Sequence, residues 1–354
     1  MKKYNFNAGP SVLPDDVFKY SAEAIKDLDK SGLSILEISH RSEKFSEIIT
    51  KAKNLALQIS DLNRSEYEVL FLQGGASHQY LMVASNFLND VAGYVNTGTW
   101  SEKAIGEAKY YGNVIEVASS KDKNHTYIPK EIKVLEDLDY LHITSNNTIF
   151  GTQFHTFPDT NSPLVADMSS DIFSRKINFS NFDLIYAGAQ KNIGAAGVTM
   201  VILKKEILEK NKRKIPSILS YKNHVEKQSL YNTPPVFSIY TCMLNMEWIL
   251  KSGGIEAIEK KNIEKAKLLY NEIDNNDAFY GFVEKSDRSN MNVTFGTNNN
   301  YNSEKFNRMC SNNDINGIKG HRSVGGFRVS LYNAISIDSV KVLVELMQKF
   351  NKEG

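Results

Sequence analysis

The feature that most constrains the fold is a regular alternation of short apolar segments with segments of helical spacing. Helical periodicity predicts helices at residues 17–28, 45–59, 78–88 and 128–135. Repeated strand–helix units of this length need crossover connections, so they predict an α/β chain with a mainly parallel sheet covered by helices. Seven apolar segments are expected to supply its strands: residues 66–72, 91–95, 113–118, 139–144, 164–167, 184–186 and 198–203.

The chain changes character near residue 254. A helix expected at residues 238–251 ends at Gly253-Gly254, and a long amphipathic helix follows at 255–274. The remainder is typical of an α+β domain, with expected strands at 282–284, 292–295 and 327–331 and helices at 303–312 and 337–350. We therefore expect a large domain over residues 15–254 and a smaller domain formed by residues 1–14 and 255–354.

The composition is ordinary for a globular protein and excludes several functions. Of 354 residues, 41% are hydrophobic and 23% charged, and the formal net charge is +1. So small a charge gives no global field that attracts nucleic acid or an anionic membrane. We expect a cytoplasmic protein, because no stretch approaches the roughly 18 apolar residues of a membrane span and the N-terminus lacks a signal-peptide core. Cys242 and Cys310 lie in expected helices and indicate neither a disulfide framework nor a zinc site, and no metal is expected.

Polar and small residues follow several of the expected strands. In parallel sheets, ligands bind at the carboxyl ends of the strands. Gly74-Gly75, between a strand and a helix, could admit an anion to the helix N-terminus or form only a tight turn. Trp100 could offer a flat stacking surface or belong to the core, and Thr148 could donate to a ring hydroxyl or simply lie in a loop.

Lys191 and Asp167 carry the most specific chemistry at this edge. Pyridoxal phosphate needs a lysine that forms a Schiff base and an acid that partners the ring nitrogen. Taken alone, the two segments are better explained by a surface lysine and a helix-capping aspartate. Five complementary groups at one sheet edge favour a pyridoxal phosphate site instead.

Two segments carry cationic groups that could bind anions. Arg41 lies in the loop His40-Arg41-Ser42, and His321, Arg322 and Arg328 lie within eight positions in and after a glycine-bearing loop. Arginine binds carboxylate and phosphate groups with two parallel hydrogen bonds. A solvated cluster of surface charges explains the second segment about as well.

Taken together, these motifs are similar to those of a known family. The chain resembles the phosphoserine aminotransferases, class V enzymes of fold type I that use pyridoxal phosphate. The resemblance runs nearly end to end. It rests on the segments at residues 7–10, 40–42, 73–77, 96–100, 165–170, 187–192, 230–235 and 321–334.

The resemblance implies a role for each residue of the cofactor site. Lys191 would hold the cofactor as an internal aldimine and carry a proton between substrate and cofactor, while Asp167 would keep the ring nitrogen protonated. Trp100 would stack on the ring, and Thr148 would contact its 3′-oxygen. The cofactor phosphate would be held by Ala76, Ser77 and Gln190 and, from the other subunit, by Asn232 and Thr233. Some family members carry arginine where this chain has Ser77, so its phosphate site would rely more on N–H and hydroxyl donors.

The resemblance also implies the substrates and a homodimer with shared active sites. Arg328 would bind the substrate α-carboxylate. His40 and Arg41, with His321 and Arg322 of the partner subunit, would bind the distal phosphate or carboxylate. The implied reaction is a reversible ping-pong transamination between glutamate and 3-phosphohydroxypyruvate, which gives O-phosphoserine and 2-oxoglutarate in serine biosynthesis. Use of the related phosphorylated C4 oxo acid of vitamin B6 synthesis is left open.

Three other functions remain as alternatives. An aminotransferase of the alanine–glyoxylate type would not need the distal cluster of Arg41, His321 and Arg322. A cysteine desulfurase would need a cysteine on a mobile loop, which neither Cys242 nor Cys310 offers. A non-catalytic protein of the same fold would have no use for the Lys191–Asp167 pair.

Overall fold

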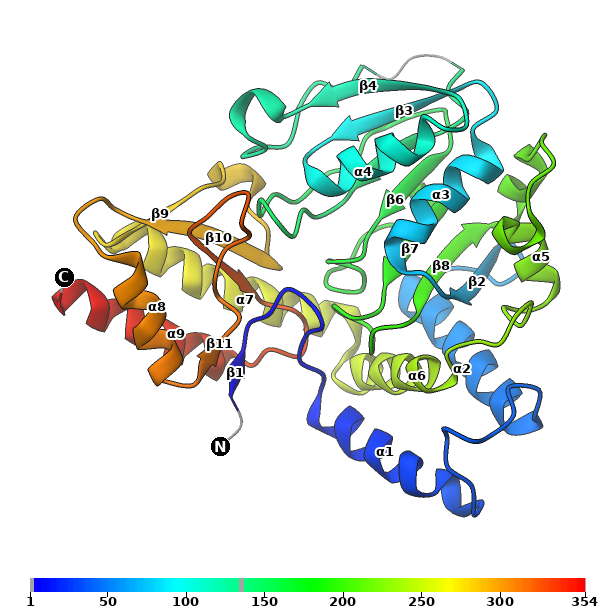
Figure 1. Ribbon diagram of the computed structural model, residues 1–354, viewed down its shortest axis with the longest axis horizontal. Coiled ribbons are helices and arrows are strands. Elements are labelled where there is room, and N and C mark those ends of the chain that lie inside the picture. Colours follow the sequence, from blue (N-terminus) through cyan, green and yellow to red (C-terminus); the bar gives the residue numbers. More distant parts are fainter. Residues whose placement is uncertain (1–2, 134–136, 354) are drawn as a thin grey trace.

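The computed structural model describes residues 3–133 and 137–353. A seven-stranded sheet forms the centre of its larger part (Figure 1). The strand order is β2-β8-β7-β6-β5-β3-β4; β8 runs antiparallel to both neighbours, and the other adjacent strands pair in parallel. The strands are β2 (Tyr67–Leu72), β3 (Val91–Asn96), β4 (Asn113–Ser119), β5 (Leu141–Thr144), β6 (Leu164–Asp167), β7 (Leu184–Gly188) and β8 (Thr199–Lys204). The predicted mainly parallel sheet of seven strands is thus confirmed.

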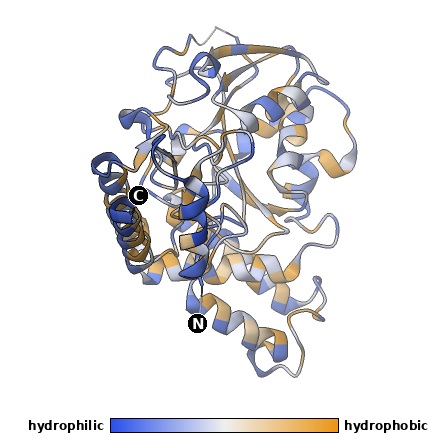
Figure 2. Ribbon diagram, turned by 60° about the vertical axis from the view of Figure 1, so that its left-hand side comes forward, coloured by the Kyte–Doolittle hydropathy of each residue, from blue (hydrophilic) through white to orange (hydrophobic). Residues whose placement is uncertain are grey.

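Helices cover both faces of this sheet. They are α2 (Glu43–Ser60), α3 (Gly75–Phe87), α4 (Thr99–Ala108), α5 (Tyr221–Glu226) and α6 (Val236–Lys251), and α1 (Asp15–Lys26) packs against α6 away from the sheet. Successive residues of β2 point to opposite faces, so Val69 and Phe71 pack with α2 and α6, whereas Leu70 and Leu72 pack with α3 and α4. Figure 2 shows hydrophobic and hydrophilic residues alternating along the outer helices, as expected when one face of each helix is buried.

A second group of elements lies beside the large sheet and contains both chain termini (Figure 1). It has an antiparallel sheet in the order β12-β10-β9, a short parallel pair of β1 and β11, and a hydrophobic cluster of its own. Its elements are β1 (Tyr4–Asn5), α7 (Gly254–Asn275), β9 (Phe279–Gly281), β10 (Asn292–Thr297), α8 (Ser303–Asn312), β11 (Ile315–Asn316), β12 (Phe327–Ser330) and α9 (Ile337–Glu353). The domain bounds expected from the sequence stay a prediction.

Two expected elements are wrong. Residues 128–133 form no helix, while residues 134 and 135 of that expected helix lie outside the described residues. The segment is anchored by a distant residue instead: the backbone N–H of Ile128 donates to the carboxylate of Asp287 at 2.8 Å, and Lys130 pairs with the same carboxylate. The strand expected at 282–284 lies instead at residues 279–281, because the pairing of Gly281 with Phe295 sets its register against β10.

Neither a membrane-spanning helix nor a cluster of metal ligands is found among the described residues. Within residues 3–133 and 137–353, no helix is long and apolar enough to cross a bilayer. The same residues contain no group of three or more histidine, cysteine or acidic side chains placed to hold a metal ion.

Candidate active site

Lys191 lies in the loop after β7, three residues beyond the end of the strand. Its amine donates a hydrogen bond to the Thr148 hydroxyl at 2.8 Å and lies 5.8 Å from the centre of the Trp100 ring. Burial lowers the pKa of this amine to about 8; the Asp167 carboxylate opposes the shift and the Arg328 guanidinium reinforces it. A lysine that loses its proton this readily is suited to attack a carbonyl.

Asp167 is the last residue of β6 and is 5% exposed. Its carboxylate accepts a hydrogen bond from the backbone N–H of Ser169 at 2.9 Å and a longer one from the Tyr80 hydroxyl at 3.4 Å. Burial raises the pKa of Asp167, while Lys191 and Ser169 act to lower it. Because buried carboxylates are stabilised by cationic partners, this one is suited to a protonated ring nitrogen.

Trp100 lies in the first turn of α4 rather than in the core. Its side chain is half-buried and lines the same cavity as Lys191. Within the described part of the chain, its buried indole nitrogen has no hydrogen-bond partner. The ring therefore offers a flat surface and a free donor to a planar ligand.

The Gly74-Gly75 pair forms the start of α3, and Gly75 lines the same cavity. Gly74 has a φ of +92°, and a Cβ there would lie 2.4 Å from the imidazole of His78, so only glycine fits this turn. Ala76 and Ser77, in the first helical turn, line the cavity together with Gln190. Unpaired N–H groups at a helix start favour an anion, so this end is suited to a phosphate.

All these groups surround one cavity of about 410 Å³. Its lining is Ala8, Gly9, Gly75, Ala76, Ser77, Tyr80, Trp100, Thr144, Asn146, Thr148, Ile149, Asp167, Ser169, Ser170, Gln190, Lys191, His321 and Arg328. An amine of lowered pKa, a buried carboxylate, a flat ring face and a helix start fit pyridoxal phosphate, the cofactor expected from the sequence.

Arg328 and His321 reach this cavity from β12 and the loop before it. Arg328 is half-buried, and burial lowers the pKa of its guanidinium. Its Nε is buried without a hydrogen-bond partner among the described residues, which leaves a donor for a ligand. The resemblance implied that His321 serves the partner's site, and in this chain His321 lines its own cavity. The backbone explains this placement: Gly320 N–H donates to the Gly326 carbonyl at 2.9 Å, which folds the loop back beside Arg328.

Some of the expected site residues lie elsewhere on the surface. Those that do not line the cavity are His40, Arg41, Asn232, Thr233 and Arg322. The side chain of Gln73 holds two of them: its Nε2 donates to the Thr233 carbonyl at 2.6 Å, and its Oε1 accepts from the Asn232 amide at 2.9 Å. This segment is therefore exposed but fixed in place.

Several lining residues were not singled out from the sequence. Tyr80 follows Ala76 by four positions, so helical spacing alone puts both on one face of α3 and could have identified it. Ser169 and Ser170 follow Asp167 by two and three positions, and Asn146 precedes Thr148 by two positions. Ala8 and Gly9 come from the N-terminal arm, which no local pattern places here.

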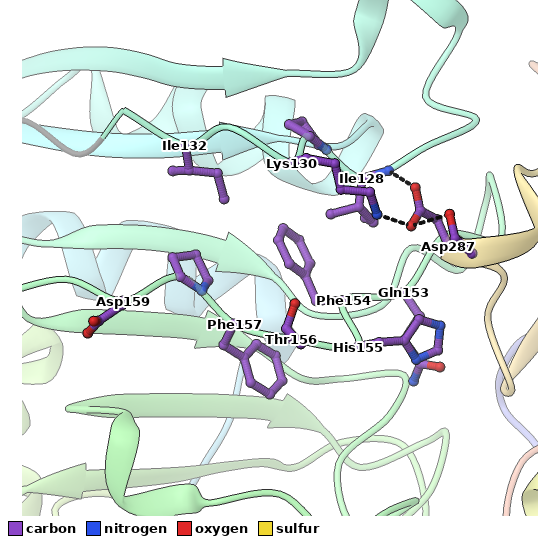
Figure 3. Close-up of a pocket in the computed structure, with 13 residues that line it drawn as sticks. Ile128, Lys130, Ile132, Gln153, Phe154, His155, Thr156, Phe157, Asp159 and Asp287 are labelled. Atoms are coloured by element: carbon purple, nitrogen blue, oxygen red, sulfur yellow. Dashed lines mark hydrogen bonds and ion pairs between the residues drawn. The ribbon is translucent and has the colours of Figure 1, made fainter.

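A second cavity, of about 300 Å³, lies between residues 128–132, residues 153–159 and Asp287 (Figure 3). Asp287 accepts from the Ile128 backbone and pairs with Lys130, and both contacts are drawn in Figure 3. A ring nitrogen of His155 bonds the Arg288 carbonyl at 3.0 Å. Because these polar groups bind one another, we place the candidate active site in the first cavity.

Comparisons with known proteins agree with this site. The sequence model of the family "Aminotransferase class-V" matches residues 3–343. A phosphoserine aminotransferase of Flavobacterium psychrophilum is 53% identical over all of both chains, and one of Flavobacterium johnsoniae is 54% identical over 98% of each.

Solved structures of similar proteins have the same fold. A phosphoserine aminotransferase from Bacillus circulans subsp. alkalophilus matches with a TM-score of 0.97 and 41% identity over 99% of each chain. A phosphoserine aminotransferase from Trichomonas vaginalis, described as bound to pyridoxal phosphate (PLP), matches at 0.93 with 35% identity over 98% of this chain and 100% of that one. An alanine–glyoxylate aminotransferase from Nostoc sp. is only 15% identical, with a TM-score of 0.76 over 99% of this chain and 95% of that one, and shares the fold alone. The chain therefore belongs to the class-V aminotransferases and, within them, to the phosphoserine aminotransferase family.

Proposed function

We propose that this chain transfers the amino group of glutamate to 3-phosphohydroxypyruvate, giving 2-oxoglutarate and O-phosphoserine, with pyridoxal phosphate as cofactor. The observation that carries the proposal is that the amine of Lys191, with its lowered pKa, shares one cavity with Asp167 and Arg328. The names of relatives about half identical to the chain support the substrates. Such a reaction serves serine biosynthesis.

The residues of this chain have separate tasks in the reaction. When bound, pyridoxal phosphate supplies an electron sink for the charge left by removal of an α-proton. The amine of Lys191 moves that proton at the substrate α-carbon, because it lies in the cavity and is easily deprotonated. With the cofactor bound, Asp167 would hold the proton on the ring nitrogen, Trp100 would cover one ring face, and Thr148 would donate to the 3′-oxygen. The phosphate would be held by Ala76, Ser77 and Gln190 and by Asn232 and Thr233 of the partner subunit.

Substrate choice depends on two anion sites. Arg328 binds the α-carboxylate that glutamate and 3-phosphohydroxypyruvate share, with the two parallel hydrogen bonds that arginine can donate. The distal phosphate or carboxylate lies against His321 and Arg322, with His40 and Arg41 of the partner subunit. This assignment of subunits is supported by His321 lining its own cavity and by Arg41 lying outside it.

A homodimer with shared active sites follows from this proposal. Asn232 and Thr233 are exposed and lie outside their own cavity, as residues that serve a second chain should. Large apolar side chains are also exposed on α1 and the segment after it, and they would be buried by a partner: Phe18, Tyr20, Ile25, Leu33 and Leu36.

We also propose the domain bounds and the compartment. The large pyridoxal-phosphate domain spans residues 15–254, and the small domain comprises residues 1–14 and 255–354. The separate hydrophobic cluster of the small sheet, which includes Phe6, supports this division. A cytoplasmic location is supported by Cys242 and Cys310, which are free and buried.

A two-step assay tests the proposed function. The protein is loaded with pyridoxal phosphate, converted with glutamate alone, and then given oxo acids while its absorption spectrum is followed. We expect 3-phosphohydroxypyruvate to be aminated at least about 100-fold more efficiently than pyruvate, because pyruvate leaves the distal cations unpaired. Lys191→Ala serves as the inactive control. Equal use of pyruvate and 3-phosphohydroxypyruvate would refute the assignment of the substrate.

A further inference from the structure

A series of buried amide side chains joins the Lys191 loop to the strand that carries Arg328. Asn192, next to Lys191, is 3% exposed, and its side-chain oxygen accepts a hydrogen bond from the backbone N–H of Asn333 at 3.0 Å. Asn333 follows Arg328 by five positions, just after β12 ends. From α6, the amide of Asn245 donates to the backbone carbonyl of Asn192 at 2.7 Å. The residue beside the reactive lysine is thus held from two sides.

The segment 331–333 also contacts the cavity itself. The hydroxyl of Tyr332 donates to the carbonyl of Ala8, a lining residue, at 2.9 Å. Thr148, the residue that accepts from the Lys191 amine, acts to lower the pKa of the Tyr332 hydroxyl, so the two side chains are neighbours. A displacement of this segment would therefore also displace the cavity lining at Ala8 and the side chain of Lys191.

Two side chains of α7, which lie one helical turn apart, also bind residues 331–333. The amine of Lys265 is 1% exposed and donates to the carbonyls of Leu331 and Tyr332, at 2.9 Å each. The amide of Asn262 donates to the side-chain oxygen of Asn333 at 2.9 Å. Burial lowers the pKa of Lys265 to about 7, so the fold holds this amine where water cannot solvate its charge.

Stability alone does not require polar groups here, because apolar residues of similar size can fill buried positions without desolvating amides. The side-chain oxygen of Asn262 has no partner among the described residues, but the donors of Asn262, Lys265 and Asn333 are bonded. Bonded donors of this kind fix one arrangement, since alternatives would leave them buried and unpaired. We propose that Asn192 is a positioning residue that, through the backbone of Asn333, sets the Lys191 amine relative to the Arg328 guanidinium. Asn262 and Lys265 fix the far end of this link. The inference rests on the proposed function, in which Lys191 moves a proton of a substrate bound by Arg328.

The test compares Asn192→Leu with a matched control, both loaded with pyridoxal phosphate. In the half-reaction with glutamate, we expect Asn192→Leu to lower kcat/KM by about 10- to 100-fold, as small displacements of reacting groups do. The affinity for pyridoxal phosphate should stay close to that of the wild type, and the backbone amide of Asn333 should exchange its hydrogen faster. The control is Asn86→Leu, since Asn86 is also 3% exposed and donates to the carbonyls of Met82 and Leu219 at 2.7 Å, away from the cavity. It should keep the wild-type kcat/KM.

Three outcomes would overturn the inference: an unchanged kcat/KM in Asn192→Leu, equal losses in both variants, or an Asn333 amide that stays as protected as in the wild type. If Asn192→Leu does not fold, Lys265→Met takes its place and must show the same loss of kcat/KM. Failure of the proposed function is seen separately, as a wild-type protein that does not aminate 3-phosphohydroxypyruvate. The glutamate half-reaction and the exchange of the Asn333 amide still decide the role of Asn192 in that case.

Discussion

The amine of Lys191 lies 2.8 Å from the hydroxyl oxygen of Thr148, so the loops that follow β7 and β5 meet at the atom expected to react. Asp167, at the end of β6, belongs to the strand between them. Three adjacent strands thus deliver an amine, a hydroxyl and a carboxylate to one sheet edge.

The pH dependence of cofactor uptake tests the lowered pKa of Lys191. In the cofactor-free protein, only the neutral amine attacks pyridoxal phosphate, and burial lowers its pKa from 10.5 to about 8. The rate of uptake, followed by absorbance, should therefore rise about tenfold per pH unit below 8 and level off above it. Lys191→Ala should show no such phase. A midpoint near the pKa of free lysine would contradict the effect of burial.

Asp167→Asn tests the acid at the end of β6. The change keeps the size of the side chain but removes its negative charge, so we expect kcat to fall by about 100-fold or more, as when a preorganised electrostatic group is lost. Asp139→Asn is the matched control, because its carboxylate accepts backbone N–H bonds from Asn89, Asp90 and Val91 away from the cavity. That variant should lose stability but keep kcat. A normal kcat in Asp167→Asn would exclude the acid from the reaction.

Arg328→Lys tests the carboxylate site. Lysine cannot donate two parallel hydrogen bonds, so KM for glutamate should rise by roughly 10- to 100-fold, the effect of losing a hydrogen bond to a charged group. Affinity for pyridoxal phosphate should change little. Arg288→Lys is the control, since Arg288 also makes two bonds, at 2.9 and 2.8 Å, but to Asp274. If both variants have the KM of the wild type, the α-carboxylate is bound elsewhere.

Hybrid dimers test which subunit supplies Arg41. Lys191→Ala and Arg41→Ala proteins should each be nearly inactive with 3-phosphohydroxypyruvate. In a hybrid of the two, one site combines an intact Lys191 with an intact Arg41 of the partner subunit. Unfolding and refolding an equal mixture should therefore restore about a quarter of wild-type activity, because half of the dimers are hybrids with one working site each. No recovery after mixing would show that Arg41 serves its own chain.

Part of the structure could be predicted from local pattern. The strands and helices of the large sheet follow from apolar runs and helical spacing, and the order of these segments predicts parallel pairing. The helix expected at residues 128–135 is absent at residues 128–133, where Asp287, more than 150 positions away, binds the backbone of Ile128 and the side chain of Lys130. The position of His321 in the cavity of its own chain was not predicted either, because it depends on how its loop folds back beside β12.

The sequence by itself determined that Lys191, Asp167, Thr148 and Trp100 would gather, because carboxyl ends of parallel strands meet at one edge of a sheet. Only the tertiary structure decided which residues from other parts of the chain complete the cavity at that edge. Arg328, His321 and Ala8 come from segments that pack against it from outside the large sheet. The buried bond between Asn192 and Asn333, 141 positions apart, joins the two parts. Such contacts depend on how two separately packed groups of elements fit together, and no local periodicity records that fit.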